Sequence, residues 1–416
     1  MSRRRSTLAL AMLLVGTSLR ASAQTPSPTP APTPSPASAP AEDAAPKLTP
    51  YAAVYFNGFH NSDGTNNQDV PLWANAGTGD TGATARQSRF GVRASLPAVF
   101  GAKTSAAIEV DFFGGFPAIG TGENFGQVRL RLANMRLDWK NTALVIGQDW
   151  MVFAPVNPSS LACAAIPLFA GAGNPWARLP QVRLERQFGA GLVQAAVLAP
   201  QSGDFNSAFL AQPNSGSLSE LPYFQGRLAW TSKNAFGSGK PGAVGVSGHY
   251  GQSQVTPTGG GTAKDLDSTG GAVDWSWPLG KHVLLSGEAF LGENLAGFQA
   301  AVFQGYNPDQ VTASAPGGTP ESITAKGGWA QLAVTPGASK LTVLAAYGID
   351  DPDDADLVSA TSRNWRMRNE VVALALQYRA SAQLSFGIEY RFLETRWLQT
   401  GTQKDRHLNL AAVMSF

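Results

Sequence analysis

The chain has 416 residues, with 31 lysines and arginines against 29 aspartates and glutamates. This near balance gives no general attraction to nucleic acid, so we expect no nucleic-acid partner. The single cysteine, Cys163, excludes an intrachain disulfide framework and any multi-cysteine metal site, and no motif suggests a cofactor.

The first residues have the pattern of an export signal. Arg3, Arg4 and Arg5 precede a short apolar run, residues 8–17, and Ala21-Ser22-Ala23 offers small residues to a signal peptidase. The apolar run is too short to cross a bilayer as a helix. We therefore predict a signal peptide over residues 1–23. Its removal takes away four of the 31 basic residues, so 27 remain against 29 acidic residues, a net charge of −2.

Residues 24–46 are dense in proline, alanine and serine. Such a segment cannot bury a core, so we expect an extended periplasmic linker. The remaining residues, 47–416, are rich in glycine and contain no long apolar stretch. A soluble β-protein and a membrane β-barrel share this composition, because barrel strands alternate and hide their lipid-facing side from hydropathy averages. The spacing of apolar residues within each strand must therefore distinguish a soluble β-protein from a membrane barrel.

Sixteen segments are predicted to be strands, because most of them alternate between apolar and polar residues with the period of two that a β-strand has. Segments 142–150, 281–290 and 325–335 alternate poorly, so the count could differ by two. Connections between them are alternately short and long, as in an antiparallel barrel with periplasmic turns and extracellular loops. The predicted strands are 51–59, 86–97, 101–112, 127–139, 142–150, 179–187, 190–198, 221–232, 242–252, 268–278, 281–290, 325–335, 340–349, 367–379, 382–394 and 404–416. The long loops are 60–85, 113–126, 151–178, 199–220, 253–267, 291–324, 350–366 and 395–403. The sequence therefore predicts an all-β fold, a closed transmembrane barrel of about sixteen antiparallel strands with both termini periplasmic.

The last segment has the clearest alternation. Leu408, Leu410, Ala412 and Met414 share one face with the C-terminal Phe416, and the opposite face is mainly polar or small. One apolar and one polar face suit a wall between lipid and water. The terminal phenylalanine also resembles the signal that barrel-assembly machinery reads, so we expect this machinery and outer-membrane lipid and lipopolysaccharide as partners.

The face opposite the apolar one should line a pore. The charged residues that alternation places there are Arg89, Arg93, Glu109, Asp111, Arg129, Arg131, Arg183, Glu185, Arg227, Arg379, Glu389 and Arg391. Arginine stays charged and binds carboxylate or phosphate through paired hydrogen bonds, and rings of arginine favour anions. Arginines outnumber acids in this set, which predicts a preference for anionic solutes. The alternative is that these residues only pair with one another across the wall.

One segment does not fit a simple alternation. Arg136 and Asp138 lie out of phase with Arg129, and a β-bulge near Ala133 would bring them to the same face.

The loop 151–178 contains four prolines and ends at Arg178. Loops of this length are usually functional or disordered. We expect it to fold into the barrel and to narrow the pore. A second loop, Asp350 to Asp356, is acidic, but it lacks the glycine and terminal glutamate of an EF-hand, so calcium binding is only an alternative.

Five motifs follow one another in the first half of the barrel: Ser88 to Gly91, Glu109 to Gly114, Arg129 to Arg131, Ile146 to Trp150 and Pro180 to Arg183. In content and order over residues 86–200 they resemble the DcaP-like family of trimeric outer-membrane porins. The resemblance implies a sixteen-stranded homotrimer that passes small anions such as dicarboxylates, with pore arginines at Arg89, Arg129, Arg131 and Arg183. Family members begin with a periplasmic coiled coil, which the proline-rich segment 25–46 replaces here.

Two other classes of function compete with a porin. An outer-membrane enzyme would need a nucleophile or acid beside one of the four histidines, His60, His249, His282 and His407, but no nucleophile elbow or HExxH motif accompanies them. We therefore expect no enzyme activity. A structural or adhesive barrel would instead have a lumen filled by apolar or paired side chains.

Overall fold

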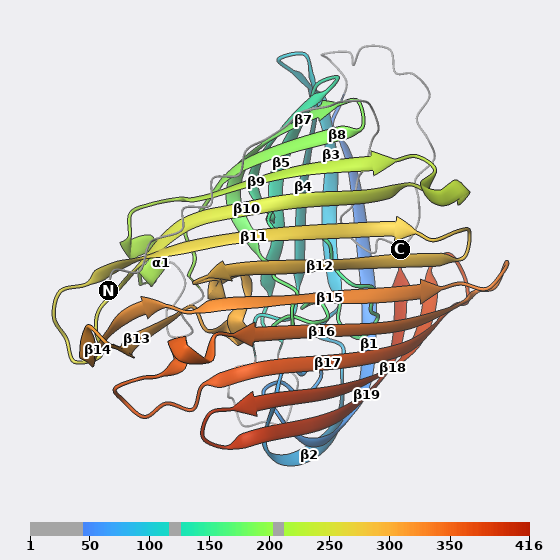
Figure 1. The fold of residues 1–416 in the computed structure, drawn as a ribbon. Helices are drawn as coiled ribbons and strands as arrows, with labels where there is room; N and C mark the ends of the chain where they lie inside the picture. The colour runs from blue at the N-terminus through green and yellow to red at the C-terminus, as the bar shows by residue number, and fades with distance from the viewer. Residues whose placement is uncertain (1–44, 116–125, 203–211) are drawn as a thin grey trace.

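In a computed structural model, residues 45–115, 126–202 and 212–416 are described, and they form an all-β fold (Figure 1). The predicted signal peptide and nearly all of the predicted linker lie outside these residues. The sixteen predicted strands are confirmed, with ends that differ by a few residues. They are β1 (Lys47–Thr65), β3 (Arg89–Val99), β4 (Ala102–Asp111), β5 (Arg129–Asp138), β6 (Thr142–Trp150), β7 (Arg178–Phe188), β8 (Gly191–Leu198), β9 (Tyr223–Ser232), β10 (Gly242–Val255), β11 (Lys264–Pro278), β12 (Val283–Glu293), β15 (Thr324–Val334), β16 (Leu341–Pro352), β17 (Arg366–Arg379), β18 (Leu384–Trp397) and β19 (Gly401–Ser415).

The sheet closes on itself through its first strand. β1 pairs antiparallel with β19 along one edge and with β3 along the other. Phe416 takes part in this closure, because its backbone exchanges two hydrogen bonds with Ala52, of 2.8 and 3.0 Å. Closure matters in a bilayer because lipid cannot hydrate the unpaired groups of a sheet edge.

Two segments that we expected to be loops contain strands. β1 continues to Thr65, where β2 (Ala74–Thr84) folds back on it and forms a seventeenth strand of the sheet. A separate hairpin, β13 (Tyr306–Thr312) and β14 (Ala315–Ser322), lies in the long connection 294–323. Both β2 and β14 are rich in glycine and small residues, so they lack the apolar alternation by which the other strands were recognised.

The two faces of the wall differ as alternation predicts. On β19, Leu410 is 52% exposed whereas its neighbour Asn409 is fully buried. The same contrast recurs around the barrel, with large apolar side chains outside and polar side chains inside. An apolar exterior around a polar interior suits a wall that separates lipid from a water-filled lumen.

A bulge in β5 resolves the phase conflict in that strand. Across the β4–β5 pair, Glu109 faces Leu132 and Val110 faces Leu130, so Arg131 is the extra residue. The predicted bulge is therefore present, two residues before Ala133. As a result Arg129, Arg131 and Arg136 all point to the interior, where Arg136 forms ion pairs with Asp138 and Glu185.

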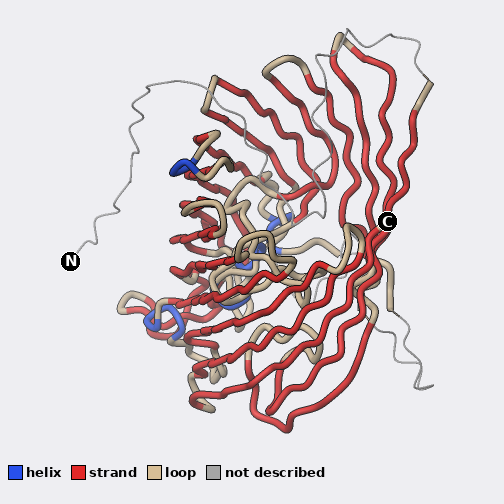
Figure 2. The backbone as a smooth tube through the Cα atoms, turned by 90° about the vertical axis from the view of Figure 1, so that its right-hand side faces the viewer, coloured by secondary structure: helices blue, strands red, loops and turns tan. Residues whose placement is uncertain are grey.

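Loop and short helical segments lie within the ring of strands (Figure 2). The principal one is residues 151–177, which we call the lumen loop, and most of its side chains are buried. It packs against two 3-10 helices, η2 (Ala296–Phe298) and η3 (Ala301–Phe303), in an apolar cluster. Three other short helices are α1 (Ser215–Leu218), η1 (Ala235–Gly237) and η4 (Asp354–Leu357). Among the described residues, no helix is long and apolar enough to cross a membrane.

Candidate functional site

The lumen loop is held by polar side chains that point inward from several strands around the wall. Nearly all of these contacts are made by backbone N–H and carbonyl groups of the loop, which need partners when buried. Val152 and Phe153 donate to the Oε1 atom of Gln225, at 3.1 and 3.2 Å. Further along the loop the acceptors are Ser247 on β10, Glu288 on β12, Gln331 on β15 and Glu389 on β18. The loop thus crosses the barrel, which agrees with the expected fold into the lumen.

One glycine of the loop is required by close packing. Gly173 has a φ of +103°, and a Cβ atom there would lie 2.2 Å from the carbonyl oxygen of Gly328 on β15. Only glycine avoids both the backbone strain and this clash.

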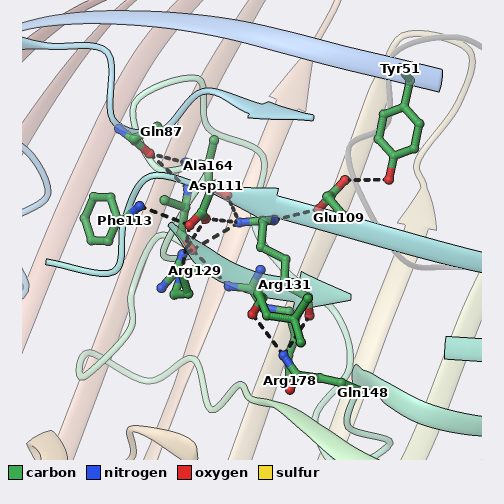
Figure 3. Close-up of polar contacts among 12 residues, drawn as sticks. Tyr51, Gln87, Glu109, Asp111, Phe113, Arg129, Arg131, Gln148, Ala164 and Arg178 are labelled. Atoms are coloured by element: carbon green, nitrogen blue, oxygen red, sulfur yellow. Dashed lines mark hydrogen bonds and ion pairs between the residues drawn. The ribbon is translucent and has the colours of Figure 1, made fainter. Parts of the chain in front are cut away.

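A cluster of five charged residues meets the loop where it approaches β4, β5 and β7 (Figure 3). The members are Glu109, Asp111, Arg129, Arg131 and Arg178, and we call them the arginine cluster. Arg129 makes a two-pronged contact with Asp111, at 3.0 and 2.6 Å. Arg131 bridges Glu109 at 2.6 Å and Asp111 at 2.9 Å.

The arginine cluster is tied to one backbone atom of the lumen loop. The carbonyl oxygen of Ala165 accepts hydrogen bonds from Arg129 at 2.8 Å and from Arg178 at 3.1 Å, and Arg131 reaches it at 3.5 Å. Three guanidinium groups therefore converge on the loop while only two carboxylates balance them. The cluster carries one net positive charge.

Arg178 supplies that uncompensated charge. Its guanidinium lies over the rings of Trp150 and Trp176, at 4.9 and 5.1 Å from their centres. Its Nη1 atom has no hydrogen-bond partner among the described residues. A cation over aromatic faces keeps its charge and its free donors, which is a suitable arrangement for meeting an anion.

Gln87 is a site residue that the sequence analysis missed. It is 1% exposed and lies just before β3. Its Nε2 atom donates to the carbonyl of Ala162 at 2.8 Å, and its Oε1 atom accepts from the N–H groups of Ala164 and Ala165, at 2.8 and 3.0 Å. It thereby fixes the turn that carries the Ala165 carbonyl. The sequence did contain evidence for Gln87, because the period of two places it on the same face of the predicted strand as Arg89 and Arg93.

The other predicted pore residues are spread around the wall, and most are paired. Arg183 contacts Asp149 at 2.9 Å and Glu185 at 2.8 Å. Arg227 pairs with Asp274 at 2.6 Å, and Arg391 lies 3.4 Å from Glu389. These pairs correspond to the alternative in which wall arginines are neutralised by neighbouring acids.

Besides Arg178, three predicted arginines have no carboxylate partner within ion-pair distance among the described residues: Arg89, Arg93 and Arg379. Arg89 lies over the ring of Tyr55 at 5.8 Å and Arg93 over the ring of Tyr51 at 4.2 Å. Arg379 is exposed at the short-turn end of β17.

The acidic segment 350–356 uses its carboxylates for separate contacts. Asp350 accepts from the N–H groups of Ala301 and Val302, at 3.1 and 3.0 Å, and so anchors η3. Asp354 pairs with Arg396. The described residues contain no group of three or more side chains placed to hold a metal ion.

One histidine lies beside a serine. The Nε2 atom of His249 is 3.0 Å from Ser268 Oγ, but the Ser268 hydroxyl donates to the backbone oxygen of Asn294 at 2.7 Å. The Nδ1 atom of His249 has no partner among the described residues. The pair thus lacks the carboxylate that orients a catalytic histidine.

Comparison with known proteins gives matches at the level of structure only. No protein-family model and no curated protein matches the chain. The outer membrane channel DcaP of Acinetobacter baumannii superposes with a TM-score of 0.66 at 18% identity, covering 90% of this chain and 99% of that one. An anion-selective porin from Comamonas acidovorans gives 0.54 at 14% identity, covering 89% and 100%. Salmonella typhi OmpF, in a complex with daunomycin, gives 0.56 at 11% identity, covering 89% and 97%.

The resemblance to DcaP that the sequence motifs indicated over residues 86–200 therefore extends, as a shared fold, over most of the chain. Two of these neighbours are named as an outer membrane channel and as a porin, and the barrels of all three match this one in architecture. The chain has the closed β-barrel fold that these structures share.

Proposed function

We propose that this barrel is a porin-type channel for small polar solutes, narrowed by the lumen loop and selective for anions. The observation that carries the proposal is the arginine cluster, where three guanidinium groups and two carboxylates meet the loop. A fixed net positive charge beside a narrow passage attracts anions and repels cations.

Charge around the cluster supports the same sign of selectivity. Arg89 lies on β3 beside β4, which carries Glu109 and Asp111, and it adds a cation without an ion-pair partner among the described residues. A structural neighbour is itself named an anion-selective porin. Small carboxylates, including dicarboxylates, fit this chemistry because arginine binds them through paired hydrogen bonds.

The assembly proposed here is a homotrimer in the outer membrane. One structural neighbour, OmpT of Vibrio cholerae, is described in a trimer form. The proposal includes contact with lipid and lipopolysaccharide, which the apolar outer wall supports, and recognition of Phe416 by barrel-assembly machinery. Native mass spectrometry in detergent tests the trimer directly.

A second candidate function has its own support. The lumen loop, η2, η3 and residues 70–74 of the first loop form one apolar cluster inside the barrel. Such packing is what a closed, structural barrel would need. The two functions differ in a planar bilayer: a porin gives stepwise current increases as single proteins insert, whereas a plugged barrel inserts without current. Insertion must be measured separately, by protease protection of reconstituted protein, so that silence is interpretable.

A further inference from the structure

A cavity of about 290 Å³ lies on the short-turn side of the lumen loop. Residues 157–164 of the loop form one side of it, and the inner wall from β3 through β1, β19 and β18 to β16 forms the other. We call it the vestibule pocket. Its volume is at the lower end of small-molecule sites, which span roughly 300–1,000 Å³.

The vestibule pocket is lined by cations and by no acidic side chain of the described residues. The cations are Arg89 and Arg131 at one end, and Lys340 and Arg379 at the other. Arg131 is already paired with Glu109 and Asp111, and Lys340 donates to the carbonyl of Ala380 at 2.9 Å. Arg89 and Arg379 have no ion-pair partner within the described part of the chain. The pocket therefore holds positive charge that an anion can balance.

Neutral hydrogen-bonding groups make up much of the remaining lining. They include Asn157, Ser159, Thr342, Gln377, Gln383 and Ser385. The Nε2 atom of Gln377 is buried and has no partner among the described residues. Three aromatic residues, Tyr55, Trp150 and Tyr378, also line the pocket. A simple carboxylate with an aliphatic body would displace water from these groups without replacing the hydrogen bonds, which lowers affinity.

From this lining we infer that the vestibule pocket binds a small organic anion rich in hydroxyl groups, such as a sugar acid or a sugar phosphate. This inference rests on the proposed channel function. The anionic group faces the unpaired guanidinium groups, and the hydroxyl groups exchange hydrogen bonds with the amide and hydroxyl side chains. The pocket is then a waiting position for the solute next to the narrow passage.

The test measures block of chloride current through single channels in a planar bilayer. Gluconate and hexanoate are the probes, since both are six-carbon monoanions and only gluconate carries hydroxyl groups; sorbitol serves as the uncharged polyol. We expect gluconate to block at concentrations about tenfold lower than hexanoate, and sorbitol not to block. Arg379→Ala should weaken gluconate block about tenfold, as loss of one hydrogen bond to a charged group does. Gln377→Leu should weaken gluconate block while leaving hexanoate block unchanged.

Lys281→Ala is the matched control, because Lys281 lies at another short turn and outside the pocket lining. It should leave gluconate block unchanged. Equal block by gluconate and hexanoate in a conducting channel overturns the inference and leaves the channel function standing. Equal effects of Arg379→Ala and Lys281→Ala overturn it as well. Absence of chloride current in verified insertions instead contradicts the channel function itself.

Discussion

The guanidinium of Arg178 lies 3.1 Å from the carbonyl oxygen of Ala165, so the wall of the barrel is bonded directly to the backbone of the lumen loop. Arg129 contacts the same oxygen at 2.8 Å. The charge of the passage and the position of the loop are therefore linked, and a change at either side is expected to alter both selectivity and conductance.

Removal of Arg178 should reduce anion preference. Arg178→Ala deletes the one member of the arginine cluster that lacks a carboxylate partner, so the cluster becomes neutral. Reversal potentials in a salt gradient should shift toward zero. Arg186→Ala is the control, since Arg186 lies on the same strand but bonds Thr142 away from the cluster. An unchanged potential in Arg178→Ala would show that this residue does not set selectivity.

Removal of both Arg129 and Arg131 should change the ion selectivity more than removal of Arg178 alone. Arg129→Ala with Arg131→Ala leaves Glu109 and Asp111 without their guanidinium partners, which should turn the channel toward cations. Breaking buried ion pairs of this kind costs about 3–5 kcal/mol of folding stability. A variant that also carries Glu109→Gln and Asp111→Asn removes the stranded carboxylates and leaves Arg178 as the one net positive charge of the cluster, so it should recover thermal stability and anion preference together. Retention of full anion preference in the double variant would contradict the assigned role of the cluster.

Gln87 should act through the position of the loop. Gln87→Leu removes hydrogen bonds to Ala162, Ala164 and Ala165, each worth about 0.5–1.5 kcal/mol net. We expect a lower unfolding temperature together with larger and noisier single-channel conductance. Gln87→Glu keeps the acceptor oxygens and should be intermediate in both measurements. Conductance traces identical to wild type in a folded Gln87→Leu protein would argue against this role.

Gly173→Ala should dislodge the lumen loop from β15. The added methyl would meet the carbonyl of Gly328, and the backbone conformation is unfavourable for alanine. Gly261→Ala separates these effects, because Gly261 has a φ of +120° but a Cβ atom added there would meet nothing within 4 Å. We expect a small loss of stability in Gly261→Ala, of about 1 kcal/mol, and altered conductance only in Gly173→Ala.

Cys163 reports on whether the loop stays inside the barrel. Burial raises the pKa of the Cys163 thiol to about 12. The thiolate is the reactive form, so below that pH the thiol stays protonated, and both its protonation and its burial protect it. A maleimide at pH 8 should label the folded wild-type protein very slowly and the urea-unfolded protein fully. Labelling should accelerate in Gly173→Ala. Rapid labelling of the folded wild type would mean that the loop leaves the lumen.

The barrel itself was predictable because lipid and water impose a period of two on every strand. Segments such as β19 show it without interruption, and together with the rhythm of short and long connections it located the sixteen strands, including three that alternate poorly. β2 was missed because it has no large apolar residue to alternate. The bulge in β5 was predictable from the phase of its charges, but its position at Arg131 depends on pairing with β4, which one strand alone does not contain.

The sequence could predict which charged residues belong to the candidate site, but not how they pair. Alternation places Glu109, Arg129 and Arg131 on one face, and all three belong to the arginine cluster. It says nothing about which charges pair, because that depends on contacts between distant segments. Arg183 and Arg227 share the same phase as the cluster residues yet are neutralised by local acids. Gln87 was overlooked because an uncharged side chain in that pattern is indistinguishable from other polar residues of the wall.

The most direct test of the account is the zero-current potential of the purified wild-type protein in a planar bilayer with tenfold different potassium chloride concentrations on the two sides. A positively charged passage predicts a potential with the sign of chloride preference, and a smaller value in Arg178→Ala. A potential with the sign of potassium preference would contradict the account, since the three guanidinium groups at the lumen loop would then not govern which ions pass.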